Sequence, residues 1–253
     1  MRSWAIIVAG LAALLCGCSK PAPNRVTKTN PDALELLELR YQANPGTVSP
    51  PEIAEELGYL TPLKLNCVGS TASGPTSIQA VVTGDTDFGS AFDGAVNGEQ
   101  ALRQGRVDVA TLGTIFRDRA LERGGIRLLF SDYQLYGEFT AGSYVLRNDF
   151  IRNNPKTARK FVEAVARALD WERTTPREQV VRRFQDLIAK RKRTEDASAI
   201  RFWLSSGVAG HSGLLTSKDF QIWLDWMVKD GELSTGQVHA SDVFNNRLNP
   251  FAT

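Results

Sequence analysis

Residues Leu63–Phe92 read LKLNCVGSTASGPTSIQAVVTGDTDFGSAF. The apolar run Leu63–Val68 predicts a strand, and the glycine- and serine-rich turn after it leads into a helix that starts near Pro75. Gly84 is expected to follow the end of that helix, because glycine is favoured just past a helix C-terminus. Asp87–Phe92 predicts the next strand. Alternation of strands and helices favours an α/β fold on a parallel sheet, with helices on its faces.

The preceding segment has the same pattern. Leu36–Gln42 predicts a strand, and Ser49-Pro50-Pro51-Glu52 predicts a capping box with proline in the first helical turn. Gly58 is expected to close this helix. Residues 36–92 therefore predict a β-α-β-α-β unit.

The C-terminal half is predicted to be helical. Asn154-Pro155 starts one helix, Thr175–Glu178 forms a second capping box, and further helices are expected at Ala197–Leu204 and Lys218–Lys229. Apolar residues recur at helical spacing behind the first two starts. They are Ala158, Phe161, Val162, Val165 and Leu169 in the first helix, and Val180, Val181, Phe184, Leu187 and Ile188 in the second.

A short motif occurs twice. Gln79-Ala80-x-x-x-Gly84-x-x-Asp87 recurs as Gln100-Ala101-x-x-x-Gly105-x-x-Asp108. Each copy reads as a helix end, a glycine cap and an aspartate that opens a strand, so Val109–Gly113 predicts a second-lobe strand. Two unrelated amphipathic helix ends remain the alternative interpretation.

The N-terminus predicts export. Arg2 precedes the apolar run Trp4–Leu15, which is too short to span a bilayer as a helix of about 20 residues and suits the apolar core of a signal peptide. Leu15-Cys16-Gly17-Cys18 resembles the lipobox of bacterial lipoproteins, which places a lipid on Cys18 after cleavage. Residues 1–17 are thus the expected signal peptide and 18–33 a tether. An ordinary secretory signal or a membrane-associated N-terminal helix is the alternative.

Composition excludes several classes of function. Lys and Arg total 30 against 28 Asp and Glu, a near-neutral balance that argues against nucleic-acid binding. His211 and His239 are not spaced from each other or from cysteines and carboxylates as metal ligands are, which argues against a metal site. The sequence contains no P-loop or dinucleotide-binding motif. Lys190–Arg193 is expected to end a helix and face solvent, and Trp223 and Trp226 are expected to pack in the core.

The order and spacing of several segments resemble a known family. The segments are Asn44–Thr47, Gly69–Thr71, Gln79–Phe88, Gly142–Val145 and Asn154-Pro155. They resemble the ABC-transporter solute-binding proteins for aliphatic sulfonates, taurine and nitrate, whose broad family includes the thiamine-precursor binders. The resemblance implies two α/β lobes of the type II periplasmic-binding-protein kind, with ligand between them.

The resemblance also implies a shortened second lobe. In the family the two motif copies lie about a hundred residues apart, whereas here they follow each other directly, so an internal deletion is expected near residues 94–100. The expected parts are a first lobe at 34–96, a remnant of the second lobe at 97–138, and a crossover strand with C-terminal helices at 139–253. A degenerate fragment or an interaction protein that no longer binds ligand is the alternative function.

The predicted site lies at the carboxyl ends of the strands, where parallel α/β sheets bind ligands. Backbone N–H groups and hydroxyls there suit a small oxyanion. The expected ligand contacts are Thr47, Ser70, Thr71, Ser73, Gly74, Ser90, Ala91 and Phe92, with Thr111 and Gly113 from the second lobe. Simple caps and turns are the alternative role for each hydroxyl.

The expected protein is a lipid-anchored, monomeric, extracytoplasmic binding protein that delivers its solute to an ABC permease and ATPase. It is not expected to be an enzyme or to need a cofactor. Some proteins that resemble this family are desulfinases with a cysteine nucleophile after an early strand. Here Cys67 falls inside a predicted strand and is expected to be a small buried residue. A desulfinase-like enzyme is therefore the weaker alternative function.

Overall fold

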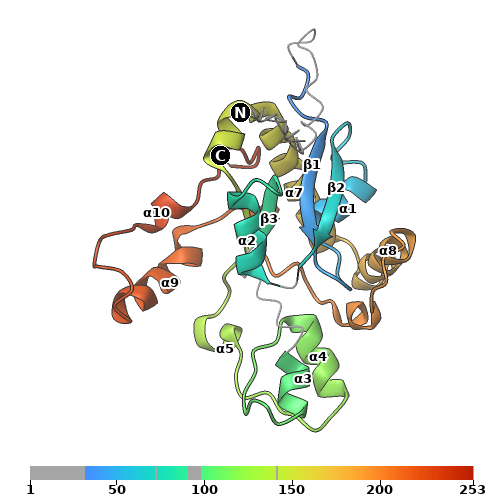
Figure 1. The fold of residues 1–253 in the computed structure, drawn as a ribbon, viewed down its shortest axis with the longest axis vertical. Helices are drawn as coiled ribbons and strands as arrows, with labels where there is room; N and C mark the ends of the chain where they lie inside the picture. Colours follow the sequence, from blue (N-terminus) through green and yellow to red (C-terminus); the bar gives the residue numbers. More distant parts are fainter. Residues whose placement is uncertain (1–31, 72, 91–97, 141, 253) are drawn as a thin grey trace, which may run out of the picture.

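The computed structural model describes residues 32–71, 73–90, 98–140 and 142–252 (Figure 1). Its first part alternates strands and helices, as predicted. The elements are β1 (Glu38–Ala43), α1 (Pro50–Glu56), β2 (Lys64–Ser70), α2 (Gly74–Val82) and β3 (Phe88–Ser90). β1 and β2 pair in parallel, with Glu38 opposite Lys64 and Ala43 opposite Ser70.

The rest of the chain is mainly helical. It contains α3 (Gly98–Arg103), α4 (Thr114–Glu122), α5 (Asp132–Tyr136), β4 (Tyr144–Leu146), α6 (Asn148–Asn153), α7 (Pro155–Thr174), α8 (Arg177–Lys190), the 3₁₀ helices η1 (Ser198–Phe202) and η2 (His211–Gly213), α9 (Ser217–Lys229) and α10 (Ala240–Val243). No helix of the described residues is long and apolar enough to cross a membrane.

Local signals set the starts of α1 and α2. The predicted capping box is confirmed in α1, where the Ser49 backbone N–H and hydroxyl both donate to the Glu52 carboxylate at 2.9 Å. α2 begins after Ser73, whose hydroxyl accepts the Thr76 N–H at 3.4 Å. Side-chain acceptors at these positions satisfy amide groups that the first helical turn leaves without backbone partners.

Asp87 joins β3 to β1. Its N–H donates to the Arg40 carbonyl at 2.9 Å, and its carboxylate accepts the Arg40 N–H at 2.7 Å. The same carboxylate pairs with the Arg40 guanidinium, with Nη2 2.8 Å from Oδ1. On its other edge β3 pairs with β4 in the antiparallel sense, Gly89 opposite Val145. The third strand is therefore tied to β1 through Asp87 but belongs to a second, antiparallel sheet with β4, so the prediction of one parallel sheet is wrong for β3.

The core lies between the strands and the helices α1, α7 and α8. Phe161 of α7 is fully buried and packs on Phe88 with ring centroids 4.5 Å apart, while Phe88 stacks on Tyr41 at 5.6 Å. The predicted helical stripes are confirmed. Ala158, Phe161, Val165 and Leu169 are buried in α7, as are Val180, Val181, Phe184 and Ile188 in α8, while Val162 and Leu187 are partly buried.

The two motif copies share their caps but not their strands. Gly84 and Gly105 both have positive φ, and the next residues, Asp85 and Arg106, donate to the carbonyls of Ala80 and Ala101 at 2.9 Å. After Asp108, however, the structure has no strand, so the prediction for Val109–Gly113 is wrong. A strand needs a hydrogen-bonding neighbour, and no described strand lies beside this segment.

Charge, rather than an apolar core, holds the α3–α4 pair together. Glu99 is buried and pairs with Arg103 at 2.9 Å, Arg123 at 3.3 Å and Arg119 at 3.6 Å. Burial by itself raises the pKa of Glu99, but the hydrogen bonds and charges of Arg103 and Arg123 bring it below its ordinary value. Arg119 also reaches Asp196 at 3.2 Å, which ties α4 to the segment before η1.

Two helical predictions in the C-terminal half are wrong in detail. The predicted capping box at Thr175 does not form, because α7 extends to Thr174. The Thr175 N–H donates to the Trp171 carbonyl at 2.9 Å and ends α7. α8 then starts at Arg177 without a side-chain cap. The helix expected at Ala197–Leu204 is the shorter 3₁₀ helix η1.

α9 forms as predicted, but its tryptophans do not pack in the core. Trp223 and Trp226 are each about half exposed, which contradicts the core prediction. The buried face of α9 instead presents Leu224 and Asp219. Asp219 accepts N–H groups from Thr140 and Thr216, so a polar contact decides which side of the helix turns inward.

Candidate functional site

The parallel pairing of β1 and β2 brings two predicted ligand loops to one edge of the sheet. The Thr71 N–H donates to the Ala43 carbonyl at 2.9 Å, so the loop after β2 is joined to the end of β1. The carboxyl ends of both strands point toward the α3–α4 pair (Figure 1). Ser90 ends β3, and its N–H donates to the Ser77 hydroxyl at 3.1 Å. Ala91 and Phe92 lie outside the described residues.

The loop after β1 is bound by the protein's own side chains. The Gly46 N–H donates to the Glu195 carboxylate at 2.7 Å, and the Thr47 hydroxyl donates to the Asn44 carbonyl at 3.0 Å. The Thr47 carbonyl accepts Arg191 Nη2 at 2.7 Å. An internal carboxylate therefore takes the amide that the sequence predicted for a ligand oxyanion.

Arg191 and Arg193 belong to this buried network, so the prediction that Lys190–Arg193 faces solvent is wrong for both. Arg191 pairs with Glu195 and, at 2.9 Å, with Glu52. Arg193 lies 3.4 Å from Glu52 and donates to the Tyr41 hydroxyl at 3.2 Å. Burial, followed by the charge of Glu52, raises the pKa of Tyr41. The chain turns back past the end of α8, which brings these arginines onto the sheet edge.

The loop after β2 remains more accessible. Ser70 and Ser73 are exposed, while the Thr71 hydroxyl accepts the Ser73 N–H at 3.1 Å and donates to the Ser73 carbonyl at 3.2 Å. Gly74 is the first residue of α2, and Pro75, which follows it, has no N–H to offer. Hydroxyl groups rather than helix amides are therefore the main donors of this loop.

The second-lobe residues stand before α4. Gly113 is the N-cap of α4, and its carbonyl accepts the Arg117 N–H at 2.8 Å; Thr111 is exposed. Within the described residues, no hydrogen bond joins Thr111 or Gly113 to the loops after β1 and β2. The structure thus gathers Thr47, Ser70, Thr71, Ser73 and Gly74 at one edge and leaves the second-lobe residues on a separate segment.

Comparison with known proteins identifies part of the chain. Residues 93–179 match the model of a family described as NMT1/THI5 like. The match covers less than half of the chain and shows a likeness of this segment to that family. The NMT1/THI5-like family includes ABC-transporter binding proteins for sulfonates, nitrate and taurine, which work outside the cytoplasm. No curated protein matches the sequence.

A solved structure supports the fold. A protein from Bordetella bronchiseptica RB50 superposes with a TM-score of 0.66 at 14% sequence identity, over 85% of this chain and 96% of that chain. The chain therefore has an α/β fold of the type II periplasmic-binding-protein kind. The superposition covers almost all of the Bordetella chain.

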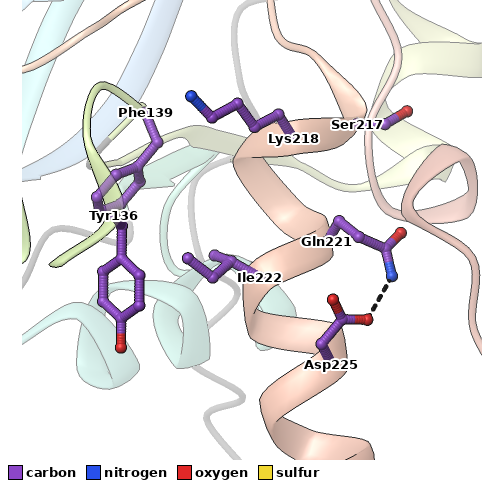
Figure 2. A pocket seen from close by; sticks show the side chains of 7 residues that line it. All are labelled: Tyr136, Phe139, Ser217, Lys218, Gln221, Ile222 and Asp225. Carbon is purple, nitrogen blue, oxygen red and sulfur yellow. Dashed lines mark hydrogen bonds between the residues drawn. The ribbon is translucent and has the colours of Figure 1, made fainter.

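Two cavities lie away from the strand edge. The first, of about 400 Å³, lies between Tyr136 and Phe139 on one side and α9 on the other (Figure 2). Its α9 wall is mostly polar, and Gln221 Nε2 donates to Asp225 Oδ1 at 2.8 Å. None of the predicted ligand residues lines it.

The second cavity, of about 600 Å³, is called the Glu172 cavity here. Its walls are Thr114 at the start of α4, α5 with the following turn, the junction of α7 and α8, and the loop 203–209. Sequence reasoning missed it. One signal was available, since Glu172 stands seven residues after Val165 on the apolar stripe of α7 and places a carboxyl group where an apolar residue is expected.

Ser212 and Cys67 are held by contacts within the protein. Ser212 Oγ lies 2.7 Å from both His211 Nδ1 and Asp170 Oδ2, but Ser212 is almost fully buried and cannot reach a substrate. The Cys67 thiol donates to the Gly69 carbonyl at 3.2 Å and is only partly buried, less than predicted. No group of His, Cys, Asp or Glu within the described ranges is arranged to hold a metal ion.

Proposed function

We propose that this chain is the solute-binding component of an ABC importer for a small oxyanion-bearing solute of the alkanesulfonate, taurine or nitrate class. The mechanism is capture of the solute, closure of the two lobes around it and docking on a membrane permease, without covalent chemistry. The protein acts as a monomer outside the cytoplasm, held to the membrane by lipid on Cys18.

One observation carries this proposal. The parallel β1–β2 pair presents the loop Ser70–Gly74 at the carboxyl edge of the sheet, joined to the end of β1 through Thr71 and facing the α3–α4 pair. Ligands of α/β sheets bind at this edge. The exposed hydroxyls of Ser70 and Ser73 suit an oxyanion, since hydrogen bonds to a charged acceptor are among the stronger ones. The NMT1/THI5-like match and the shared fold support the same function.

Removal of both hydroxyls tests the site. The Ser70→Ala/Ser73→Ala variant is expected to bind the preferred anion at least about tenfold more weakly, because each lost hydrogen bond to an anion is worth about 1.5–3 kcal/mol. Isothermal titration of the full chain in mild detergent against propanesulfonate, taurine and nitrate measures this.

The matched control is Ser234→Ala/Ser241→Ala, which removes two hydroxyls from the distant α9–α10 region and should leave affinity unchanged. Ser73 also caps α2, so affinity and not melting temperature is compared. If the wild-type protein binds none of the three anions, the oxyanion proposal is contradicted. If the Ser70→Ala/Ser73→Ala variant keeps its anion affinity, the ligand does not bind at these two hydroxyls.

The lipid anchor has a separate test. Cys18→Ala is expected to move the protein from the membrane fraction to the soluble fraction, because lipidation requires that thiol. Cys16→Ala is the matched control and should remain in the membrane fraction, since Cys16 lies in the segment removed on cleavage. Fractionation and immunoblotting measure both variants. Cys18→Ala protein that stays with the membrane rules out this anchor.

A further inference from the structure

The Glu172 cavity has the size of a ligand site. Its volume of about 600 Å³ falls within the range of roughly 300–1,000 Å³ typical of small-molecule pockets. It is built from four parts of the chain: Thr114, and residues within 132–139, 172–177 and 203–209. None of the residues predicted for the oxyanion lines it, so it is independent of the proposed function.

Glu172 is an unsatisfied acid in the wall of this cavity. Its side chain is buried, with 4% of the residue exposed, and its Oε1 has no hydrogen-bond partner in the described part of the chain. Burial raises the pKa of Glu172 to about 8. A buried carboxyl without a partner is costly and uncommon in proteins, and it calls for a compensating group.

The neighbouring arginines do not supply that group. Arg173 Nη2 donates to the carbonyls of Val208, Ala209 and Gly210 at 2.9, 3.2 and 3.1 Å. Arg177 donates through Nε to the Trp203 carbonyl at 2.8 Å. These contacts hold the loop 203–209 as a wall of the cavity. Among the described residues no ion pair joins Glu172 to a cation.

The other walls carry groups that attract a positive charge, beside the guanidinium groups of Arg173 and Arg177, which are bound to loop carbonyls. Asp132 and Glu138 add two carboxylates, and Tyr133, Phe139 and Trp203 add aromatic rings. Aromatic faces attract organic cations. Trp203 is buried and Phe139 is partly buried, whereas Tyr133 is exposed. A buried carboxyl group and aromatic rings that line the same cavity suit the recognition of an ammonium group.

We infer that the Glu172 cavity binds a small organic cation, whose ammonium group meets the Glu172 carboxyl while its apolar part lies against the rings of Tyr133, Phe139 and Trp203. The cation supplies the partner that Glu172 lacks. Glu172 ionises when the cation enters and releases its proton to solvent. At pH 7 a group with a pKa of about 8 is about nine-tenths protonated, so binding releases close to one proton.

The test uses benzylammonium, with benzyl alcohol and benzoate as neutral and anionic probes of similar size. Isothermal titration of the full chain in mild detergent at pH 7 is expected to show benzylammonium binding at least about tenfold more tightly than either. Titration in two buffers of different ionisation enthalpy is expected to show the released proton. Glu172→Gln should lose at least about tenfold in benzylammonium affinity and all of the proton release.

Glu163→Gln is the matched control, because it makes the same change on a more exposed part of α7 and should keep both properties. Circular dichroism verifies that both variants are folded. Absence of benzylammonium binding, preference for benzoate, or undiminished binding by Glu172→Gln each overturns the inference.

Discussion

Glu172→Gln is expected to stabilise the protein at neutral pH and to leave its stability near pH 4.5 almost unchanged. Burial raises the pKa of this carboxyl from an ordinary value of 4.5 to about 8 in the folded state. Between these values the folded chain binds more protons at this site than the unfolded chain, so the free energy of unfolding falls as pH rises. Glutamine has nearly the same shape and does not ionise.

The expected difference between variant and wild type grows from near zero at pH 4.5 to about 3 kcal/mol at pH 7, at 1.36 kcal/mol per unit of pKa shift. Urea unfolding at several pH values measures it. Glu163→Gln, which makes the same change on a more exposed part of α7, is the matched control. A difference that is constant with pH contradicts the raised pKa.

The other groups with a shifted pKa titrate outside this window. Burial, with the charges of Glu172 and Glu52, raises the pKa of Tyr144 well above its ordinary value. Carboxyl groups whose pKa is lowered lose their stabilising effect only as pH falls below about 4.5. They include Glu35, Glu99, Asp196 and Asp219. Measurements above pH 5 therefore isolate Glu172.

Asp87→Ala is expected to cost about 3 kcal/mol of the free energy of unfolding. The substitution removes the acceptor of the Arg40 backbone N–H and of the Arg40 guanidinium at the junction of β1 and β3. A buried donor left without a partner costs about 1–3 kcal/mol, and the partly buried charge left behind adds to this. Urea unfolding at pH 7 measures the loss.

Asp108→Ala is the matched control, since Asp108 holds the same place in the second copy of the motif. It is exposed and follows an identical glycine cap, but no strand begins there. Its expected cost is below about 0.5 kcal/mol, as for most surface substitutions. Equal costs for the two variants would show that the second copy also anchors a sheet.

Much of the first lobe could be predicted from local signals. The capping box Ser49–Glu52, the N-cap Ser73 and the glycine after α2 act within one turn of the chain, and the apolar stripes of α7 and α8 follow helical periodicity. The predicted oxyanion loops depend on one further inference, that parallel strands place their carboxyl ends together, and the β1–β2 pairing confirms it.

The site was predicted less completely than the fold. The hydroxyls of Ser70 and Ser73 are accessible at the expected edge, but Glu195 takes the Gly46 amide from a position 149 residues away. The Glu172 cavity combines the end of α7 with the turns around Phe139 and Trp203. No sequence window contains these parts together, so their proximity could not be predicted from spacing.

The sequence by itself determined where the helices and strands of the first lobe begin and end, because caps and periodicity act between near neighbours. Only the tertiary structure decided whether a segment with strand character found a strand beside it, as after Asp87 but not after Asp108. It also decided that Arg191 and Arg193 turn inward and that Trp223 and Trp226 stay exposed. Backbone pairing and burial depend on distant partners, and the same local pattern has different outcomes when those partners differ.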